Sequence, residues 1–150
     1  MLEVRNILHF TPFYFKNNKG AKDKFFVVLK RINDDKVILA SLPSSQDHIP
    51  AYIELTDSGC VELPDANFNC FAIMPSTCVT ECGKFFKKKT FLYGHQISDY
   101  NVANIRETYR IEGVNFSVFG KMEERLFDKL IACFKNSKSI KRKYKRELAV

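Results

Sequence analysis

The stretch KFFVVLKRINDDKVILASL, residues 24–42, decides the fold of this chain. It contains two runs of Phe, Val, Ile and Leu, and residues of these types favour β-strands. The runs are separated by the short polar sequence NDD, which is typical of a tight turn. The stretch therefore predicts a β-hairpin with strands over residues 24–32 and 36–42.

Strand-like runs continue on both sides of the hairpin, separated by clusters of Asn, Gly, Asp, Pro and Ser. They are PFYF (12–15), AYIEL (51–55), CVEL (60–63), NCFAIM (69–74), CVTEC (78–82) and TFLYGHQI (90–97). Pro43, Pro50, Pro64 and Pro75 fall between the runs, as expected for a residue that a central strand tolerates poorly. Short strands at close spacing predict a small antiparallel sheet that is closed or strongly coiled.

Helical periodicity appears only towards the C-terminus. Residues 98–109 open with Ser98 or Asp99 as a helix N-cap. The apolar side of this helix would be formed by Val102, Ile105 and Tyr109. Residues 120–137 predict a second helix, with acidic residues early and lysines late. Its apolar side would be formed by Met122, Leu126, Leu130, Cys133 and Phe134.

The chain has the length and apolar content for one domain. Of its 150 residues 45% are hydrophobic and 14 are Phe, which is enough for a real core. We expect a mainly β domain with packed C-terminal helices over residues 1–137, followed by a basic tail over 138–150. No run approaches the roughly 18 to 20 apolar residues that cross a bilayer, and the N-terminus lacks a signal-peptide pattern. We therefore expect a soluble, cytoplasmic protein that makes no membrane contact.

The five cysteines are an odd number and lie mostly in or beside strand-like runs. This arrangement is unlike that of a small disulfide-stabilised scaffold, so we expect reduced thiols. The first four, Cys60, Cys70, Cys78 and Cys82, form no pair of Cys-x-x-Cys motifs. We therefore expect no metal site and no cofactor, with zinc as the alternative for these cysteines.

Positive charge is concentrated at the C-terminal end. Residues 135–150 contain seven basic residues and one acidic residue, so they carry +6 of the net charge of +7. Such a run commonly contacts phosphates, and the alternative is a solubilising helix end. The sequence KFFKKK, residues 84–89, would add to the same positive field.

The order of these elements resembles the MazF/PemK family of toxin ribonucleases. A first strand leads into the polar loop KNNKGAKD (16–23), and KFFVVL, VILASLPSSQ, IPAYIEL and GHQI follow in the family's order. The resemblance covers nearly the whole chain and implies a small SH3-like antiparallel barrel with packed helices. It further implies a homodimer, an antitoxin partner and metal-independent cleavage of single-stranded RNA. The chain departs from the family in an inserted cysteine-bearing segment, roughly residues 56–89.

The resemblance also assigns candidate site residues. Lys24 stands where the family has its catalytic arginine, and Lys22 takes that place if the loop shifts register. Ser44 matches the family's threonine, with Ser45 beside it, and His48 is a candidate titrating group in the same corner. The catalytic candidates are Lys24, Ser44, Ser45 and His48. The RNA-binding candidates are Lys19, Lys22, Phe25, His95, Gln96, Lys141, Arg142 and Lys143.

Each candidate also has a purely structural interpretation. The serines can cap a Pro-Ser-Ser turn, the lysines can form a solvated loop, and His95 can be a partly buried strand residue. Because lysine lacks the planar fork of arginine, a catalytically silent SH3-like module that binds nucleic acid or protein is the alternative function. A structural or phage-associated domain without a nucleic-acid role is a third. We expect Ser44 to face Lys24 or Lys22 across one groove if the corner is catalytic.

Overall fold

A computed structural model describes residues 1–16, 20–43, 49–50 and 52–150 of the chain. The strands in this part are β1 (Asn6–Tyr14), β2 (Ala21–Ile32), β3 (Lys36–Ser41), β4 (Gly59–Leu63), β5 (Phe68–Ile73), β6 (Thr90–Tyr93), β7 (Ile97–Asn101) and β8 (Phe116–Lys121). The helices are α1 (Val102–Thr108), α2 (Glu124–Lys135) and α3 (Arg142–Leu148), with short 3-10 turns at Pro64–Ala66 and Gly94–Gln96. The fold is mainly β with packed helices, as predicted.

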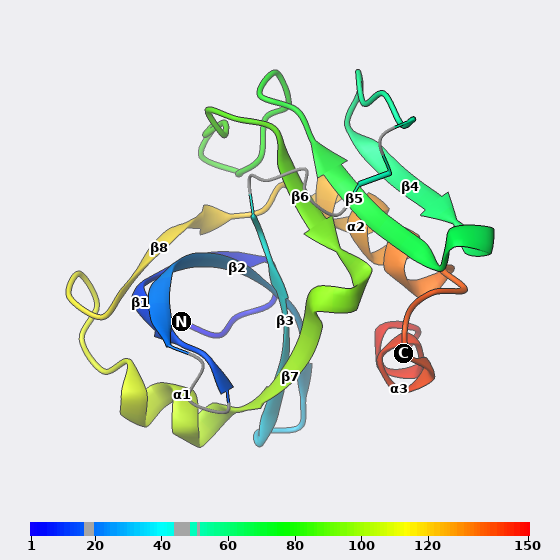
Figure 1. Ribbon diagram of the computed structural model, residues 1–150. Coiled ribbons are helices and arrows are strands. Elements are labelled where there is room, and N and C mark those ends of the chain that lie inside the picture. Colours follow the sequence, from blue (N-terminus) through cyan, green and yellow to red (C-terminus); the bar gives the residue numbers. More distant parts are fainter. Residues whose placement is uncertain (17–19, 44–48, 51) are drawn as a thin grey trace.

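The strands form two antiparallel sheets. One has the order β7-β3-β2-β1-β8 and the other the order β4-β5-β6. The first sheet coils around an interior that α1 covers at one end, and α2 lies behind the second sheet (Figure 1). The Phe91 N–H donates to the Pro43 carbonyl at 2.9 Å, which joins the start of β6 to the end of β3. The predicted hairpin is confirmed, because β2 pairs with β3 through the turn at residues 33–35.

The central hairpin is continuously apolar because both of its faces are buried. On one face Phe26 and Val28 pack in an inner cluster with Phe10 and Leu39, enclosed by the coiled sheet. On the other face Val27 packs in an outer cluster with residues of α2, α3 and the second sheet. Successive strand side chains point to opposite faces, so two cores require an unbroken apolar run.

Three predicted strands differ in the structure. The described residues of AYIEL, 52–55, form no strand, and CVTEC contributes only the isolated bridges Cys78–Phe85 and Thr80–Met122. TFLYGHQI is divided by the 3-10 turn at 94–96, after which the chain crosses from the second sheet to the first. Residue types alone do not reveal this change of sheet, because both halves are equally strand-like.

Both predicted helices begin later than expected. Residues 97–101 pair with β3 as an edge strand, so α1 starts at Val102 with Asn101 as its N-cap. Residues 116–121 pair with β1, and α2 starts at Glu124 after its N-cap Glu123. Pairing to an existing sheet edge outweighs helical periodicity at these boundaries. All eight residues of the predicted apolar sides are buried. Six of them lie in the helices, whereas Tyr109 is the C-cap of α1 and Met122 precedes α2.

The prediction of reduced thiols is wrong for two of the five cysteines. Cys60 of β4 and Cys133 of α2 form a disulfide across a sequence separation of 73 residues. The partners are distant in the sequence, and only the docking of α2 on the second sheet brings them together. Cys70, Cys78 and Cys82 are free, and burial raises the pKa of the Cys70 thiol to about 12.

The basic C-terminal segment contains a helix that packs on the domain. Within residues 138–150, Ile140, Tyr144 and Leu148 are buried in the outer cluster. The Tyr144 hydroxyl donates to Asp99 Oδ1 at 2.9 Å, and the Asp99 N–H donates to the same hydroxyl at 3.3 Å. The segment predicted to form a tail therefore contains a helix, α3, and hydrogen bonds connect this helix to the edge strand β7. None of the helices in the described residues has the length and apolar content to span a bilayer.

Replacing Tyr144 with Phe is expected to weaken this connection most at neutral pH. The hydrogen bond from Tyr144 is the main cause that lowers the pKa of Asp99 below its ordinary value. A lowered carboxyl pKa contributes stability above the unfolded pKa of about 4, and that stability is lost as the pH falls through the folded pKa. We expect Tyr144→Phe to lower the free energy of unfolding by about 1 to 2 kcal/mol at pH 7. Denaturant unfolding should show the difference shrinking below about pH 4. Lys143→Ala is the control and should change little, because it removes an exposed 3.8 Å ion pair to Asp99 and an exposed ammonium 4.9 Å from the centre of the Tyr144 ring.

Candidate active site

Three segments that the sequence singles out meet at one end of the five-stranded sheet. Phe26 of β2 lies opposite Ser41 of β3, and the Leu42 N–H donates to the Phe25 carbonyl at 3.0 Å. Ala40 of β3 lies opposite Ile97, which directly follows the turn at 94–96. The start of β2, the end of β3 and the 94–96 turn are therefore neighbours. We call this region, with Lys24, Ser41 and Gln96, the polar end of the sheet.

Lys24 lies on the inner face of the sheet. It stands opposite Phe10 and two residues before Phe26, and both of these belong to the inner cluster. Its side chain is half-buried and makes no hydrogen bond or ion pair within the described residues. Burial first, and then the nearby Lys22 ammonium, lower the pKa of Lys24. A partly desolvated cation with no partner among the described residues is suited to hold an anionic ligand.

Two further polar atoms at this end have no partner among the described residues. They are the Ser41 Oγ and the Gln96 Oε1, and both are buried. Ser41 shares the inner face with Lys24, because it stands opposite Phe26. Leaving a buried polar atom unsatisfied costs roughly 1 to 3 kcal/mol, so such atoms call for an explanation.

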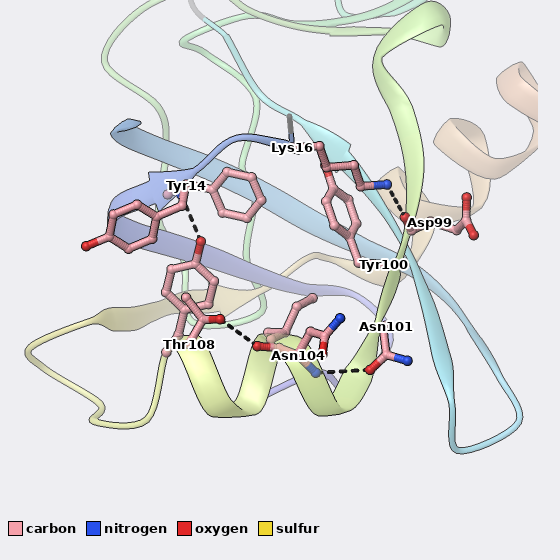
Figure 2. Close-up of a pocket in the computed structure, with 10 residues that line it drawn as sticks. Tyr14, Lys16, Asp99, Tyr100, Asn101, Asn104 and Thr108 are labelled. Carbon is pink, nitrogen blue, oxygen red and sulfur yellow. Dashed lines mark hydrogen bonds between the residues drawn. The ribbon is translucent and has the colours of Figure 1, made fainter. Parts of the chain in front are cut away.

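A pocket lies between the end of β1, strand β7 and α1 (Figure 2). It encloses about 250 Å³ and is lined by Phe13, Tyr14, Lys16, Asp99, Tyr100, Asn101, Asn104, Ile105, Thr108 and Tyr109. Lys16 spans its rim, donating to Ser98 Oγ at 3.0 Å and to the Asp99 carbonyl at 2.7 Å. The Lys16 ammonium also lies 4.2 Å from the centre of the Tyr100 ring. On the other side the Tyr14 N–H donates to the Tyr109 hydroxyl at 2.9 Å. The pocket offers aromatic walls and one cation, and Lys24, Ser41 and Gln96 are not among its lining residues.

Four of the predicted site residues, Ser44, Ser45, His48 and Lys19, lie outside the described residues. The expected opposition of Ser44 and Lys24 therefore stays a prediction, and Pro43 is the last described residue before the corner. Lys22 lies two residues from Lys24 on the same strand. Gln96 directly precedes Ile97, which lies opposite Ala40 near the end of β3.

Among the other predicted residues, Phe25 and His95 belong to the same segments, whereas the basic residues of α3 lie elsewhere. Phe25 points to the face opposite Lys24 and stacks on His9, with ring centres 4.1 Å apart and planes 5° apart. His95 is exposed, with its ring 5.5 Å from that of Tyr93. Lys141 and Arg142 are exposed at the start of α3, and Lys143 lies beside Asp99. The basic segment is thus held near β7 rather than at the polar end.

Lys16, Ser41 and Ser98 are not among the predicted site residues. Lys16 belongs to the polar loop 16–23, which contains the RNA-binding candidates Lys19 and Lys22. Its positive charge in that loop is the feature of the sequence that could have identified it. Ser41 and Ser98 lie within strand-like runs, where nothing distinguishes a functional serine from a structural one. Their positions become apparent only through the register of β3 with β2 and β7.

Comparison of the chain with protein-family models, with curated proteins and with solved structures gives no match. The interpretation of the site therefore depends on its chemistry. Within the part of the chain that the structure describes, no group of three or more His, Cys, Asp or Glu side chains is placed to hold a metal ion.

Proposed function

We propose that this protein is a divergent MazF/PemK-like endoribonuclease that binds and cleaves single-stranded RNA at the polar end of the sheet. In this proposal the coiled five-stranded sheet corresponds to the family's SH3-like barrel. The observation that carries the proposal is the register that sets the segment of β2 after Lys24 and the segment of β7 after Gln96 on either side of the end of β3. These are the segments that the resemblance assigns to the catalytic arginine, the catalytic hydroxyl and the strand matched by GHQI.

Cleavage of RNA requires three chemical roles to be filled by groups of the site. The ribose 2′-oxygen forms a bond to phosphorus while the bond from phosphorus to the 5′-oxygen breaks. The 2′-hydroxyl proton must be accepted, the charge on the phosphoryl oxygens stabilised, and the leaving 5′-oxygen protonated. Lys24 suits the second role, because an ammonium that has no partner among the described residues can stabilise the negative charge that develops on the phosphoryl oxygens. Gln96 Oε1 can accept a hydrogen bond from the substrate, and Ser44, Ser45 and His48 are the proposed hydroxyl and titrating groups of the corner.

A second candidate function is RNA binding without cleavage. The observation that favours it is Lys24 itself, since an ammonium is a point charge and lacks the bidentate geometry of the family's arginine. In either case the resemblance implies a bacterial cytoplasmic protein that forms a homodimer and is bound by an antitoxin.

Cleavage is tested by incubating the purified chain with a mixed-sequence single-stranded RNA in EDTA and analysing fragments for cyclic phosphate ends. We expect the wild type to cleave the RNA and Lys24→Met to cleave it about 100-fold more slowly, which is typical for removal of one charge-stabilising group. Ser44→Ala should show a comparable loss. Lys30→Met is the matched control, because Lys30 lies on the same strand and its ammonium bonds the Val150 carbonyl, away from the polar end.

Thermal unfolding shows whether a variant that no longer cleaves RNA is still folded. Lys24→Met removes a partly buried, unpaired charge, so we expect its melting temperature to equal or exceed that of the wild type by about 1 to 3 °C. RNA that is bound but never cut by the wild type would favour the second candidate. Cleavage that persists in Lys24→Met would rule out the proposed site.

A further inference from the structure

A groove lined by aromatic and lysine side chains lies on the outer face, beside the polar end. It encloses about 360 Å³ between the start of β2, the 85–90 segment and β8. Its lining residues are Phe25, Leu42, Phe85, Phe86, Lys87, Lys88, Thr90 and Phe119. We call it the aromatic groove. Four of its side chains, those of residues 85–88, come from the segment that the family resemblance leaves as an insertion.

The rings of the groove form a connected series. Phe119 meets Phe86 in a stacked arrangement at 5.4 Å and Phe25 edge-on at 5.9 Å, and Phe25 stacks on His9. These contacts fix the ring planes before any ligand arrives, which lowers the ordering cost of binding. Phe85 is different, because half of its surface, 50%, is exposed to solvent. A half-exposed Phe beside ordered rings has an open face for stacking.

Positive charge surrounds the rings. Lys87 and Lys88 line the groove, and none of the described lining residues is acidic. The Lys84 ammonium lies 4.8 Å from the centre of the Phe119 ring and donates to the Phe119 carbonyl at 2.6 Å. Aromatic faces flanked by cations suit a ligand that alternates flat rings with negative charges. Single-stranded nucleic acid has this composition, since bases stack on aromatics and phosphates pair with lysines.

The groove is continuous with the proposed cleavage site. Phe25 directly follows Lys24 on β2, and Leu42 lies one residue before Pro43, the last described residue before the serine corner. Lys24 and Phe25 point to opposite faces, so a strand that rounds the end of the sheet would reach both. We propose that the aromatic groove stacks unpaired bases of the RNA whose backbone is cleaved at the polar end. This inference rests on the proposed function and adds a second contact surface to it.

The test measures binding separately from cleavage. A fluorescein-labelled 12-nucleotide RNA of mixed sequence, made uncleavable by 2′-O-methyl groups, is titrated against the full chain and followed by anisotropy. We expect Phe85→Ala to weaken binding about fivefold to tenfold, corresponding to one lost base stack. Ile111→Ala removes a similarly exposed apolar side chain elsewhere and should bind like the wild type. The Phe85→Ala effect should vanish with an oligonucleotide of the same length that lacks bases.

The lysines are tested by salt dependence. Replacing Lys87 and Lys88 with Ala should reduce the slope of log affinity against log salt by about 1.4, because each lost phosphate contact on a single strand contributes roughly 0.7. Replacing Arg110 and Lys129, which are exposed outside the groove, is the matched control and should leave the slope unchanged. Circular dichroism melts verify that each variant is folded.

The outcomes separate this inference from the proposed function. If the wild type binds no RNA, the proposed function is wrong, and the groove inference, which rests on it, is wrong as well. If the wild type binds and cuts RNA but Phe85→Ala and the double lysine variant bind as tightly as it does, the groove inference alone is wrong. If the groove variants bind weakly while Lys24→Met cuts normally, the groove is supported and the polar end is rejected.

Discussion

A chain that ends at Ser137 is expected to lose its cooperative unfolding transition. The truncation removes Ile140, Tyr144 and Leu148, which are all buried in the outer cluster. Each large-to-small change of this kind costs about 2 to 5 kcal/mol, and a whole domain is stable by only about 5 to 15 kcal/mol. The truncated chain would also leave Asp99 without its Tyr144 partner. We expect it to be unfolded or molten, which calorimetry and near-ultraviolet circular dichroism detect directly.

The matched control separates the charge of this segment from its packing. Lys141, Arg142 and Lys143 are exposed, so a triple Ala variant removes positive charge and keeps the buried residues. We expect this variant to melt within about 3 °C of the wild type, because surface substitutions rarely exceed about 0.5 kcal/mol each. Its affinity for RNA should fall with a reduced salt slope if these residues contact phosphates, as the sequence predicts. A truncated chain that melts like the wild type would show that 138–150 is only an appended tail.

The central hairpin was predictable because its signal is local. Its strands are apolar at every position from Phe25 to Leu29, and its turn has the residue types that turns need. The boundaries near 94–101 were not predictable in this way. Residues 98–101 have helix-capping types, yet they form an edge strand because β3 offers them a partner. Sheet pairing between residues some sixty positions apart leaves no mark on local periodicity.

The candidate site also has a part that was predictable from the sequence and a part that was not. Lys24 and Gln96 were identified through a resemblance in the order of motifs, and the strand register brings their segments together. The aromatic groove was not identified, although Phe25 and the KFFKKK run were each noted. Its parts come from β2, β8 and the 85–90 segment, and only the fold makes them neighbours. With fourteen phenylalanines in the chain, composition cannot separate core rings from surface rings.

The disulfide provides the second large expected effect. Cys60 is on β4, an edge strand of the second sheet, and Cys133 is on α2, so the bond fastens the helix to that edge. It closes a loop with a sequence separation of 73 residues. Because a cross-link of this length restricts the unfolded chain strongly, we expect Cys60→Ser to lower the free energy of unfolding by about 2 to 4 kcal/mol. The melting temperature should fall by roughly 5 to 15 °C.

Reduction of the wild type should reproduce this loss. With dithiothreitol its melting temperature should approach that of Cys60→Ser, while Cys82→Ser, which removes an exposed free thiol, should melt like the wild type under either condition. Thiol titration of the denatured, unreduced protein should count three free thiols. A count of five, together with a melting temperature that does not respond to dithiothreitol, would contradict the bond.

The same reduction tests whether the proposed activity depends on the bond. Disulfides rarely persist in a reducing cytoplasm, so a cytoplasmic toxin would have to work without this one. Lys24 and Ser41 of the polar end belong to the five-stranded sheet, whereas Cys60 and Cys133 connect α2 to the three-stranded sheet. We therefore expect the reduced protein to cleave RNA at the oxidised rate at temperatures well below its melting point. If cleavage disappears on reduction while the protein stays folded, the bond controls the site and the independence of the two sheets is refuted.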